Sequence, residues 1–349
     1  MFGDNHPLRM TEKTQMLADG ILKRDRRSLS RAITLVESHK KEHSKQAELL
    51  IDYVLSRRRG QAMRKKDQDL LSTFRLGIAG PPGAGKSTFI EALGLMLIER
   101  GHRVAVVAVD PSSKRTGGSI LGDKTRMTYL SRTLDAFVRP SPSSGILGGL
   151  AEHTNDVILL CESAGFDIVL IETVGLGQSE VAVDDAADMC LLLLPPAGGD
   201  DLQGVKKGIM EIADLVVINK ADGELKTAAQ HATASVRHAL QLIRPRSLNW
   251  TPKVMRCSSL FNSGIDKVWD KVDEYRRTML ESGELGNKRK EQNHSWMLRQ
   301  FHEQIMREAR RHPSLQKTMT QIDSALVGGY VTPRRAAGEL LKQFLEDKE

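Results

Sequence analysis

The chain has 349 residues, of which 40% are hydrophobic, and a formal net charge of +7. This length is sufficient for one large α/β core with helical additions. No apolar run approaches the roughly 20 residues that span a bilayer, and the acids among the first 31 residues make a poor organellar targeting segment. We therefore expect a protein that is neither secreted nor bound to a membrane.

The cysteines and the basic charge indicate neither a metal site nor a nucleic-acid partner. Cys161, Cys190 and Cys257 lie far apart without metal-ligand spacing, which is typical of reduced thiols. The basic runs at 57–66 and 288–290 have no interleaved aromatic residues, and single-stranded nucleic acids usually stack on such residues. We therefore expect these runs to be solvated linkers.

Residues 1–72 are predicted to form an N-terminal helical extension and a linker. Apolar residues recur at helical spacing between residues 10 and 59, and Ser28 is placed to cap one of these helices. A polar, basic connector is expected from Gly60 to about Ser72.

Residues 73–280 are predicted to form an α/β domain. Short, near-continuous apolar runs alternate with helical patterns, as in a parallel sheet that is covered on both faces. The predicted strands are 74–79, 104–109, 168–171, 189–194, 215–218 and 253–257. This pattern predicts a doubly wound, mostly parallel sheet, in which ligands bind beyond the carboxyl ends of the strands.

Residues 281–349 are predicted to form a C-terminal helical arm. The polar stretch from Ser282 to His294 is interpreted as a linker, His312–Pro313 as a break, and Thr332–Pro333 as the start of the last helix. Such an arm can pack on its own domain or on a second subunit.

The segment from Gly80 to Ser87 reads G-x-x-x-x-G-K-S between a predicted strand and a predicted helix. In such a loop the backbone N–H groups face a polyphosphate, while Lys86 reaches the β- and γ-phosphates and the Ser87 hydroxyl binds Mg²⁺. The predicted phosphate-binding residues are Gly80, Pro81, Pro82, Gly83, Ala84, Gly85, Lys86, Ser87 and Thr88. The segment predicts a site for a nucleoside triphosphate.

The segment Asn219-Lys220-Ala221-Asp222 follows a predicted strand and is predicted to select guanine. A carboxylate such as Asp222 can accept hydrogen bonds from guanine N1–H and the 2-amino group, which adenine does not offer. Asn219 is expected to tie this loop to the phosphate loop, and the Lys220 stem to cover the base.

Acidic residues at two other strand ends are candidates for binding Mg²⁺. Glu172 ends one strand, and Gly175 after it allows its N–H to approach the γ-phosphate. Small GTPases place a water-orienting Gln after this glycine, whereas this chain has Leu176, so we expect slow hydrolysis without a partner. Asp110 and Asp123 lie in a long polar loop and suit Mg²⁺ as oxygen ligands.

These elements closely resemble the MeaB, ArgK and MMAA family of P-loop GTPases. The resemblance covers nearly the whole chain from about residue 20, and it extends to the runs 117–127, 139–145, 172–180 and 195–209. It implies a homodimeric GTPase that gates adenosylcobalamin delivery to methylmalonyl-CoA mutase and protects or reactivates that enzyme. It also implies the cobalamin adenosyltransferase as a further partner.

The resemblance implies roles for individual residues as well. Lys86 and Ser87 bind phosphate and Mg²⁺; Asp110, Asp123 and Glu172 supply metal-binding and water-activating acids; Lys206 stabilises transition-state charge when the mutase stimulates hydrolysis. Asn219, Lys220 and Asp222 bind guanine, with Ser258 and Ser259 in the last loop of the base site. The implied catalytic residues are Lys86, Asp110, Glu172 and Lys206.

Two other functions and two locations stay open. A small-molecule kinase can use the same phosphate loop, although Asp222 specifies GTP where most such kinases use ATP. An RNA-associated GTPase rests on the basic charge alone and predicts steeply salt-dependent RNA binding. The resemblance suggests the mitochondrial matrix, and a bacterial cytoplasmic protein fits the same sequence.

Overall fold

The computed structural model describes residues 9–38, 40–65, 72–109, 127–141, 153–173, 183–196 and 207–346. The chain divides into two compact units, Met1–Gly286 and Asn287–Glu349. The helices of the first unit are α1 (Glu12–Leu22), α2 (Arg26–Val36), α3 (Lys41–Lys65), α4 (Lys86–Glu99), α6 (Thr128–Arg132), α7 (Thr154–Ser163), α10 (Lys207–Ile212), η2 (Gly223–Leu225), α11 (Lys226–Gln241) and α12 (Ile265–Glu281). Its strands are β1 (Phe74–Ala79), β2 (Val104–Val109), β3 (Ala136–Ser141), β4 (Ile168–Thr173), β5 (Met189–Leu194), β6 (Leu215–Ile218) and β7 (Lys253–Arg256).

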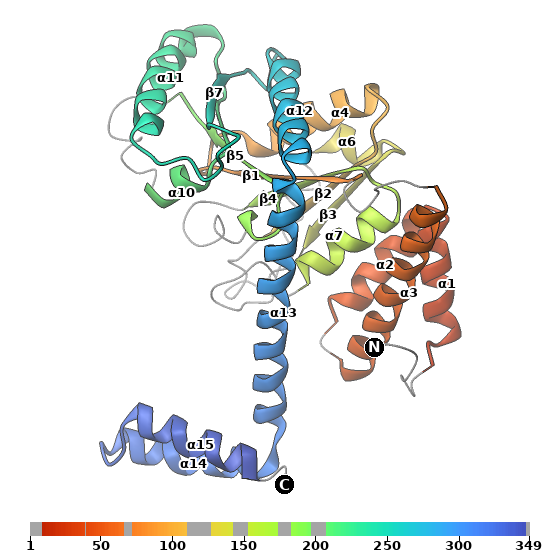
Figure 1. Ribbon diagram of the computed structural model, residues 1–349, viewed down its shortest axis with the longest axis vertical. Helices are drawn as coiled ribbons and strands as arrows, with labels where there is room; N and C mark the ends of the chain where they lie inside the picture. Colours follow the sequence, from red (N-terminus) through yellow and green to blue (C-terminus); the bar gives the residue numbers. More distant parts are fainter. Residues whose placement is uncertain are drawn as a thin grey trace. The chain divides into compact units, whose positions relative to one another are not determined.

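The strands form one sheet in the order β3-β2-β4-β1-β5-β6-β7. Each strand pairs in parallel with its neighbours, so all carboxyl ends lie at the same edge. Helices lie on both faces of the sheet (Figure 1). The predicted doubly wound parallel sheet is confirmed.

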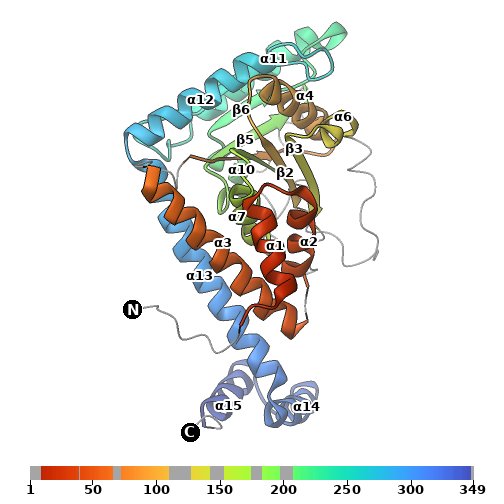
Figure 2. The same ribbon diagram turned by 90° about the vertical axis from the view of Figure 1, so that its right-hand side faces the viewer.

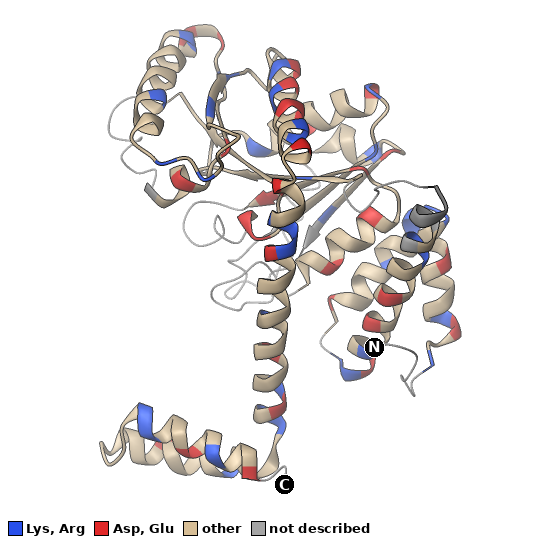
Figure 3. Ribbon diagram, in the orientation of Figure 1, with Lys and Arg blue, Asp and Glu red and all other residues tan. Residues whose placement is uncertain are grey.

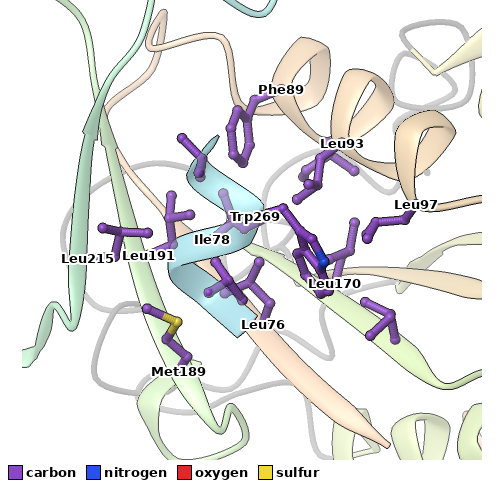
Figure 4. Close-up of a cluster of buried hydrophobic side chains, with 14 of the residues drawn as sticks. Leu76, Ile78, Phe89, Leu93, Leu97, Leu170, Met189, Leu191, Leu215 and Trp269 are labelled. Carbon is purple, nitrogen blue, oxygen red and sulfur yellow. The ribbon is translucent and has the colours of Figure 1, made fainter. Parts of the chain in front are cut away.

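Both faces of the sheet are buried because side chains alternate along each strand. Leu76 and Ile78 of β1 pack with Phe89 of α4 and Trp269 of α12 in one core layer (Figure 4). Val107 of β2 belongs to the opposite layer, which α7 covers. Full burial on both sides explains why these strands are near-continuous apolar runs.

Strand β3 is absent from the prediction, and its position in the sheet explains why. It contains Arg139 and Pro140, which interrupt the apolar run that identified the other strands. Within the part of the chain that the structure describes, it lies at the edge and pairs only with β2, and a proline is tolerated where one side of a strand forms no ladder. Arg139 pairs with Glu37 of α2 at 2.6 Å.

The N-terminal helices α1, α2 and α3 lie side by side next to α7 (Figure 2). Their buried residues share a core cluster with α7 and one face of the sheet. The predicted cap of α2 is wrong: Asp25 is the N-cap, and its carboxylate accepts from the N–H groups of Arg27 and Ser28 at 3.2 and 2.9 Å. Ser28 lies inside the first turn, and its hydrogen bonds hold the pKa of Asp25 below its usual value.

Helix α3 extends through Lys65, so the expectation that the connector begins at Gly60 is wrong. Arg and Lys are good helix formers, and one interior glycine costs only about 1 kcal/mol. Arg58 of α3 pairs at 3.3 Å with the buried Glu162 of α7, which also pairs with Arg75 of β1 at 2.7 Å. This ion-pair cluster joins the N-terminal helices to the central strand.

The polar stretch from Ser282 to His294 is also not a linker, because α13 (Glu284–Arg311) is helical throughout. Its Lys, Glu and Gln residues form helices well, and their polarity reflects exposure rather than irregular structure.

The second unit contains α14 (Pro313–Val327) and α15 (Pro333–Glu346) after α13. The predicted break at His312–Pro313 is confirmed, since Pro313 occupies the first turn of α14. The predicted start of the last helix is also confirmed, with the Thr332 hydroxyl accepting from the Arg335 N–H at 3.3 Å. Helices α14 and α15 pack on each other and bury Ile322 and Phe344.

Candidate functional site

The phosphate loop connects β1 to α4 and requires glycine at two positions. Gly80 has φ +154°, and a Cβ there would lie 2.1 Å from the Leu193 carbonyl oxygen of β5. Gly85 has φ +88°, and a Cβ there would lie 2.7 Å from Nδ2 of Asn219. The loop therefore packs against two neighbouring segments more closely than any side chain allows.

Lys86 lies over this loop. Its Nζ donates to the carbonyl oxygens of Gly80 at 2.7 Å and Pro81 at 3.3 Å, and the residue is 9% exposed. Gly85, the N-cap of α4, has no side chain to accept from the N–H groups of the first turn. An ammonium group above a helix N-terminus is an arrangement suited to a polyphosphate.

Ser87 and Glu172 bring a hydroxyl and a carboxylate together beside the phosphate loop. The Ser87 Oγ donates to Oε1 of Glu172 at 3.1 Å, and Glu172, near the end of β4, is 5% exposed. These are hard oxygen donors of the kind that Mg²⁺ prefers. The pair therefore fits the metal role predicted for it.

Asn219 joins the phosphate loop to the loop after β7. Its Nδ2 donates to the Ala84 carbonyl oxygen at 2.9 Å, as the sequence predicted. Its Oδ1 accepts from the backbone N–H of Ser259 at 3.0 Å and from the Ser259 hydroxyl at 2.8 Å. The side chain is buried, with 1% of the residue exposed. Its contacts join three chain segments: the phosphate loop, the loop after β6 and the loop after β7.

Asp222 and Ser258 lie together at the same edge of the sheet. The Ser258 hydroxyl donates to Oδ2 of Asp222, and the N–H of Ala221 donates to the Cys257 carbonyl oxygen at 3.0 Å. Lys220 is exposed and has φ +57°. Its Cε would lie 3.9 Å from a Cβ added at Gly85, so the Lys220 stem extends over the phosphate loop.

The sequence identified Ser258 and Ser259 only as sources of backbone N–H groups. Both hydroxyls are used, one toward Asp222 and the other toward Asn219. The Cys257 thiol also donates to Oδ1 of Asn219 at 3.5 Å. The available signal for these contacts was that Cys257 ends a predicted strand and two serines follow it directly.

Four predicted site residues lie outside the described residues: Asp110, Asp123, Gly175 and Lys206. Within the described part of the chain, no group of three His, Cys, Asp or Glu residues is placed to hold a metal ion. The structure does bring together the phosphate loop, Glu172, Asn219, Asp222 and Ser258, all from the carboxyl ends of parallel strands. The exposed Pro82, Gly83 and Thr88 belong to the same loop and to the first turn of α4.

The three cysteines are buried and form no disulfide. Burial raises the pKa of the Cys257 thiol to about 12 and also raises the pKa of Cys161. Among the described helices, none combines the length and apolar composition needed to cross a membrane.

Comparison with known proteins identifies relatives over nearly the whole chain. Residues 29–314 match the model of the family described as methylmalonyl-CoA mutase-associated GTPase MeaB. The chain is 49% identical to the mitochondrial methylmalonic aciduria type A homolog of Mus musculus, over 97% of this chain and 82% of that protein. It is 42% identical to the GTPase ArgK of Escherichia coli, over 92% of this chain and 93% of that protein.

A solved structure agrees with this relationship. A crystal structure described as a LAO/AO transport system kinase matches with a TM-score of 0.71 and 33% identity, over 97% of this chain and 99% of that one.

Proposed function

Because the chain belongs to the MeaB family of methylmalonyl-CoA mutase-associated GTPases, we propose that it controls the loading of adenosylcobalamin into methylmalonyl-CoA mutase and protects or reactivates that enzyme. The chain is a P-loop GTPase, which binds GTP and hydrolyses it to GDP and phosphate. In this proposal the partner is methylmalonyl-CoA mutase, and GTP binding and hydrolysis control its cofactor loading and its reactivation.

The observation that carries this proposal is the position of Asn219 between the phosphate loop and the two loops after β6 and β7 (residues 219–222 and 257–259), called the base loops. Asn219 contacts both Ala84 and Ser259, so one buried side chain joins the loops proposed to hold the two ends of the nucleotide. Such a connection suits a regulatory GTPase, in which the loops around the nucleotide respond to its hydrolysis.

The proposed chemistry uses residues in separate roles. The first-turn N–H groups of α4 and the Lys86 ammonium bind the phosphates, and Asp222 selects guanine. Ser87 and Glu172 would hold Mg²⁺ together with Asp110 and Asp123, and the metal supplies charge neutralisation at the β- and γ-phosphates. Gly175 donates to the γ-phosphate.

We place Lys206 in the step that depends on the partner. Leu176 occupies the position at which small GTPases carry a water-orienting Gln, so unassisted hydrolysis is slow. When the mutase binds, Lys206 supplies positive charge to the transferring phosphoryl group in the way an arginine finger does.

The proposed assembly is a homodimer in contact with methylmalonyl-CoA mutase, with the cobalamin adenosyltransferase as a further partner. The helical arm at 281–349 is the proposed dimerisation element, after the helical extension and linker at 1–72 and the GTPase domain at 73–280. For the location we propose the mitochondrial matrix, following the mouse relative. The bacterial cytoplasm is the alternative that the relative from Escherichia coli represents.

A small-molecule kinase is the second candidate, because the matching solved structure is described as a transport system kinase. The two functions differ in where the γ-phosphate goes. A GTPase releases inorganic phosphate whether or not an acceptor is present, whereas a kinase transfers label from [γ-³²P]GTP to the acceptor. Label recovered on an acceptor rather than in inorganic phosphate would favour the kinase.

Cofactor loading tests the proposal directly. Apo-mutase is mixed with adenosylcobalamin and the cobalamin adenosyltransferase, and binding is followed by the absorbance of the corrin. We expect loading to depend on this protein and on hydrolysable GTP, and to be lost with Lys86→Ala but not with the exposed Lys45→Ala. Equal loading with the Lys86→Ala variant would show that cofactor delivery does not need the GTP cycle.

A further inference from the structure

A second pocket lies behind the base loops, between α11, β7 and the start of α12. It has a volume of about 590 Å³ and is separate from the phosphate loop. Residues Ala221 and Ser258 of the base loops form part of its wall. A ligand in this pocket would therefore contact residues of the base loops directly.

The pocket is strongly basic. Lys226 and Arg237 of α11, Arg256 of β7 and Lys267 of α12 all line it, and none of the described lining residues is acidic. All four of these side chains are exposed. Figure 3 shows the Lys and Arg residues on α11 and β7. Gly264, the N-cap of α12, makes no side-chain cap hydrogen bond, and Asp266 in the first turn offsets the positive end of the helix dipole there, so the basic charge comes from the four side chains.

The spacing of the cations favours an extended ligand over a small anion. Lys226 and Arg237 are eleven residues apart on α11, which corresponds to about 16 Å along a helix that rises 1.5 Å per residue. An extended peptide covers this distance in about five residues at 3.3 Å each. A single phosphate group reaches only one end of the pocket.

Two features favour a peptide over a nucleic acid. The described lining residues include no aromatic side chain, so successive bases have no row of rings to stack on; Phe261 at the pocket margin offers a single ring. Among the described strands, β7 is the last of the sheet and pairs only with β6, so an extended chain can be added at its other edge. The turn between Ser258 and Ser263, at the pocket margin, also exposes Leu260 (74%) and Phe261 (66%).

We propose that this pocket binds an acidic, extended segment of a protein partner, and that its occupation slows the release of guanine nucleotide. Lys226, Arg237, Arg256 and Lys267 pair with carboxylates of the segment, and Leu260 and Phe261 contact its apolar residues. Nucleotide release is slowed because the pocket and the guanine site share Ala221 and Ser258 in their walls. Ala221 bonds to Cys257, and Ser258 bonds to Asp222, so a segment held against them restrains the loops through which guanine leaves.

The binding test uses the full chain and a fluorescein-labelled peptide of alternating glutamate and leucine, with fluorescence anisotropy as the readout. We expect the Arg237→Glu/Arg256→Glu variant to bind it at least about tenfold more weakly, a change of 1.4 kcal/mol. The matched control, Arg31→Glu/Lys45→Glu, makes the same change in net charge at exposed positions of α2 and α3. Equal loss of binding in both variants would show nonspecific attraction and overturn the proposal.

Competition identifies the ligand class. Binding of tripolyphosphate or of a single-stranded oligonucleotide more tightly than the peptide, with the same dependence on Arg237 and Arg256, would overturn the assignment to a peptide. A lysine-leucine peptide is expected not to bind.

Release of a fluorescent GDP analogue tests the coupling. Saturating acidic peptide is expected to slow release about fivefold or more in the unaltered protein and to have no effect in Arg237→Glu/Arg256→Glu. Release without peptide is expected to be equal in both proteins. An unchanged rate in the presence of bound peptide would contradict the coupling. The test requires only the guanine-nucleotide site, so its result is independent of whether methylmalonyl-CoA mutase is the partner.

Discussion

The side-chain Nδ2 of Asn219 donates a hydrogen bond to the backbone carbonyl of Ala84 at 2.9 Å, across 135 residues of sequence. This contact connects the loop that follows β6 to the phosphate loop that follows β1. The base-selecting and phosphate-binding parts of the site are therefore held as one unit.

Replacing Asn219 with Ala is expected to weaken GTP binding by about 10- to 100-fold. The change leaves the buried Ala84 carbonyl and Ser259 N–H without this partner, and each unsatisfied group costs about 1–3 kcal/mol. Binding is measured with a fluorescent GTP analogue. The exposed Asn249→Ala serves as control, and an unaltered affinity in Asn219→Ala would show that the loops are held together by other contacts.

Replacing Asp222 with Asn is expected to shift the preference from guanine to xanthine nucleotides. The amide offers a donor to the 2-oxo group of xanthine, whereas guanine loses the acceptor that its N1–H and 2-amino group require. Affinities for GTP and XTP are compared in both proteins, with Asp266→Asn as a matched exposed control. Unchanged GTP affinity would contradict the assignment of Asp222 to the base.

Alanine at Gly85 and at Gly101 separates backbone strain from close packing. Both residues have nearly the same positive φ, +88° and +90°, but a Cβ at Gly85 meets Asn219 whereas a Cβ at Gly101 meets nothing within 4 Å. Both variants are expected to lose about 1–2 kcal/mol of stability. Only Gly85→Ala is expected to lose GTP affinity, by about tenfold or more.

If Gly101→Ala lowered GTP affinity equally in the same titration, general destabilisation would explain the loss, and the close approach of Gly85 to Asn219 would not.

Cys257 is expected to contribute a pH dependence to stability above neutral pH. Burial raises its pKa to about 12, while an unfolded thiol ionises near about 8.5. The folded state therefore keeps the proton between these values and the unfolded state releases it, so this contribution to stability is full below about pH 8.5 and falls as pH rises.

Urea unfolding at pH 7 to 10 measures this effect against Cys257→Ala, which removes the thiol. The unaltered protein is expected to lose up to about 1.4 kcal/mol per pH unit more than the variant above about pH 8.5. Parallel pH profiles for the two proteins would mean that the folded thiol ionises normally.

The central strands were predictable from sequence because they are buried on both faces. Residues 189–194 read Met-Cys-Leu-Leu-Leu-Leu, the near-continuous apolar run that is typical of a strand covered on both faces. β3 was missed because an edge strand can contain Arg139 and Pro140. The start of α13 was missed because an exposed helix has the composition of a polar linker.

The candidate site was predictable where a short motif by itself specifies a loop and directly follows a strand. Gly80 to Ser87 and Asn219 to Asp222 follow strands, so their place at one edge of the sheet followed from the parallel topology. Contacts made by backbone groups were harder to predict from sequence. No residue pattern indicates that the Leu193 carbonyl oxygen lies 2.1 Å from the position of a Cβ at Gly80. The hydroxyl of Ser258 was missed for a related reason, since its contact with Asp222 depends on the conformation of two loops and not on a residue pattern.

The proposed function is tested most directly by the rate of GTP hydrolysis with and without purified methylmalonyl-CoA mutase. We expect slow hydrolysis by the protein alone, strong stimulation by the mutase, and a Lys206→Ala variant that keeps the slow rate but is no longer stimulated. A rate that the mutase leaves unchanged would contradict the account.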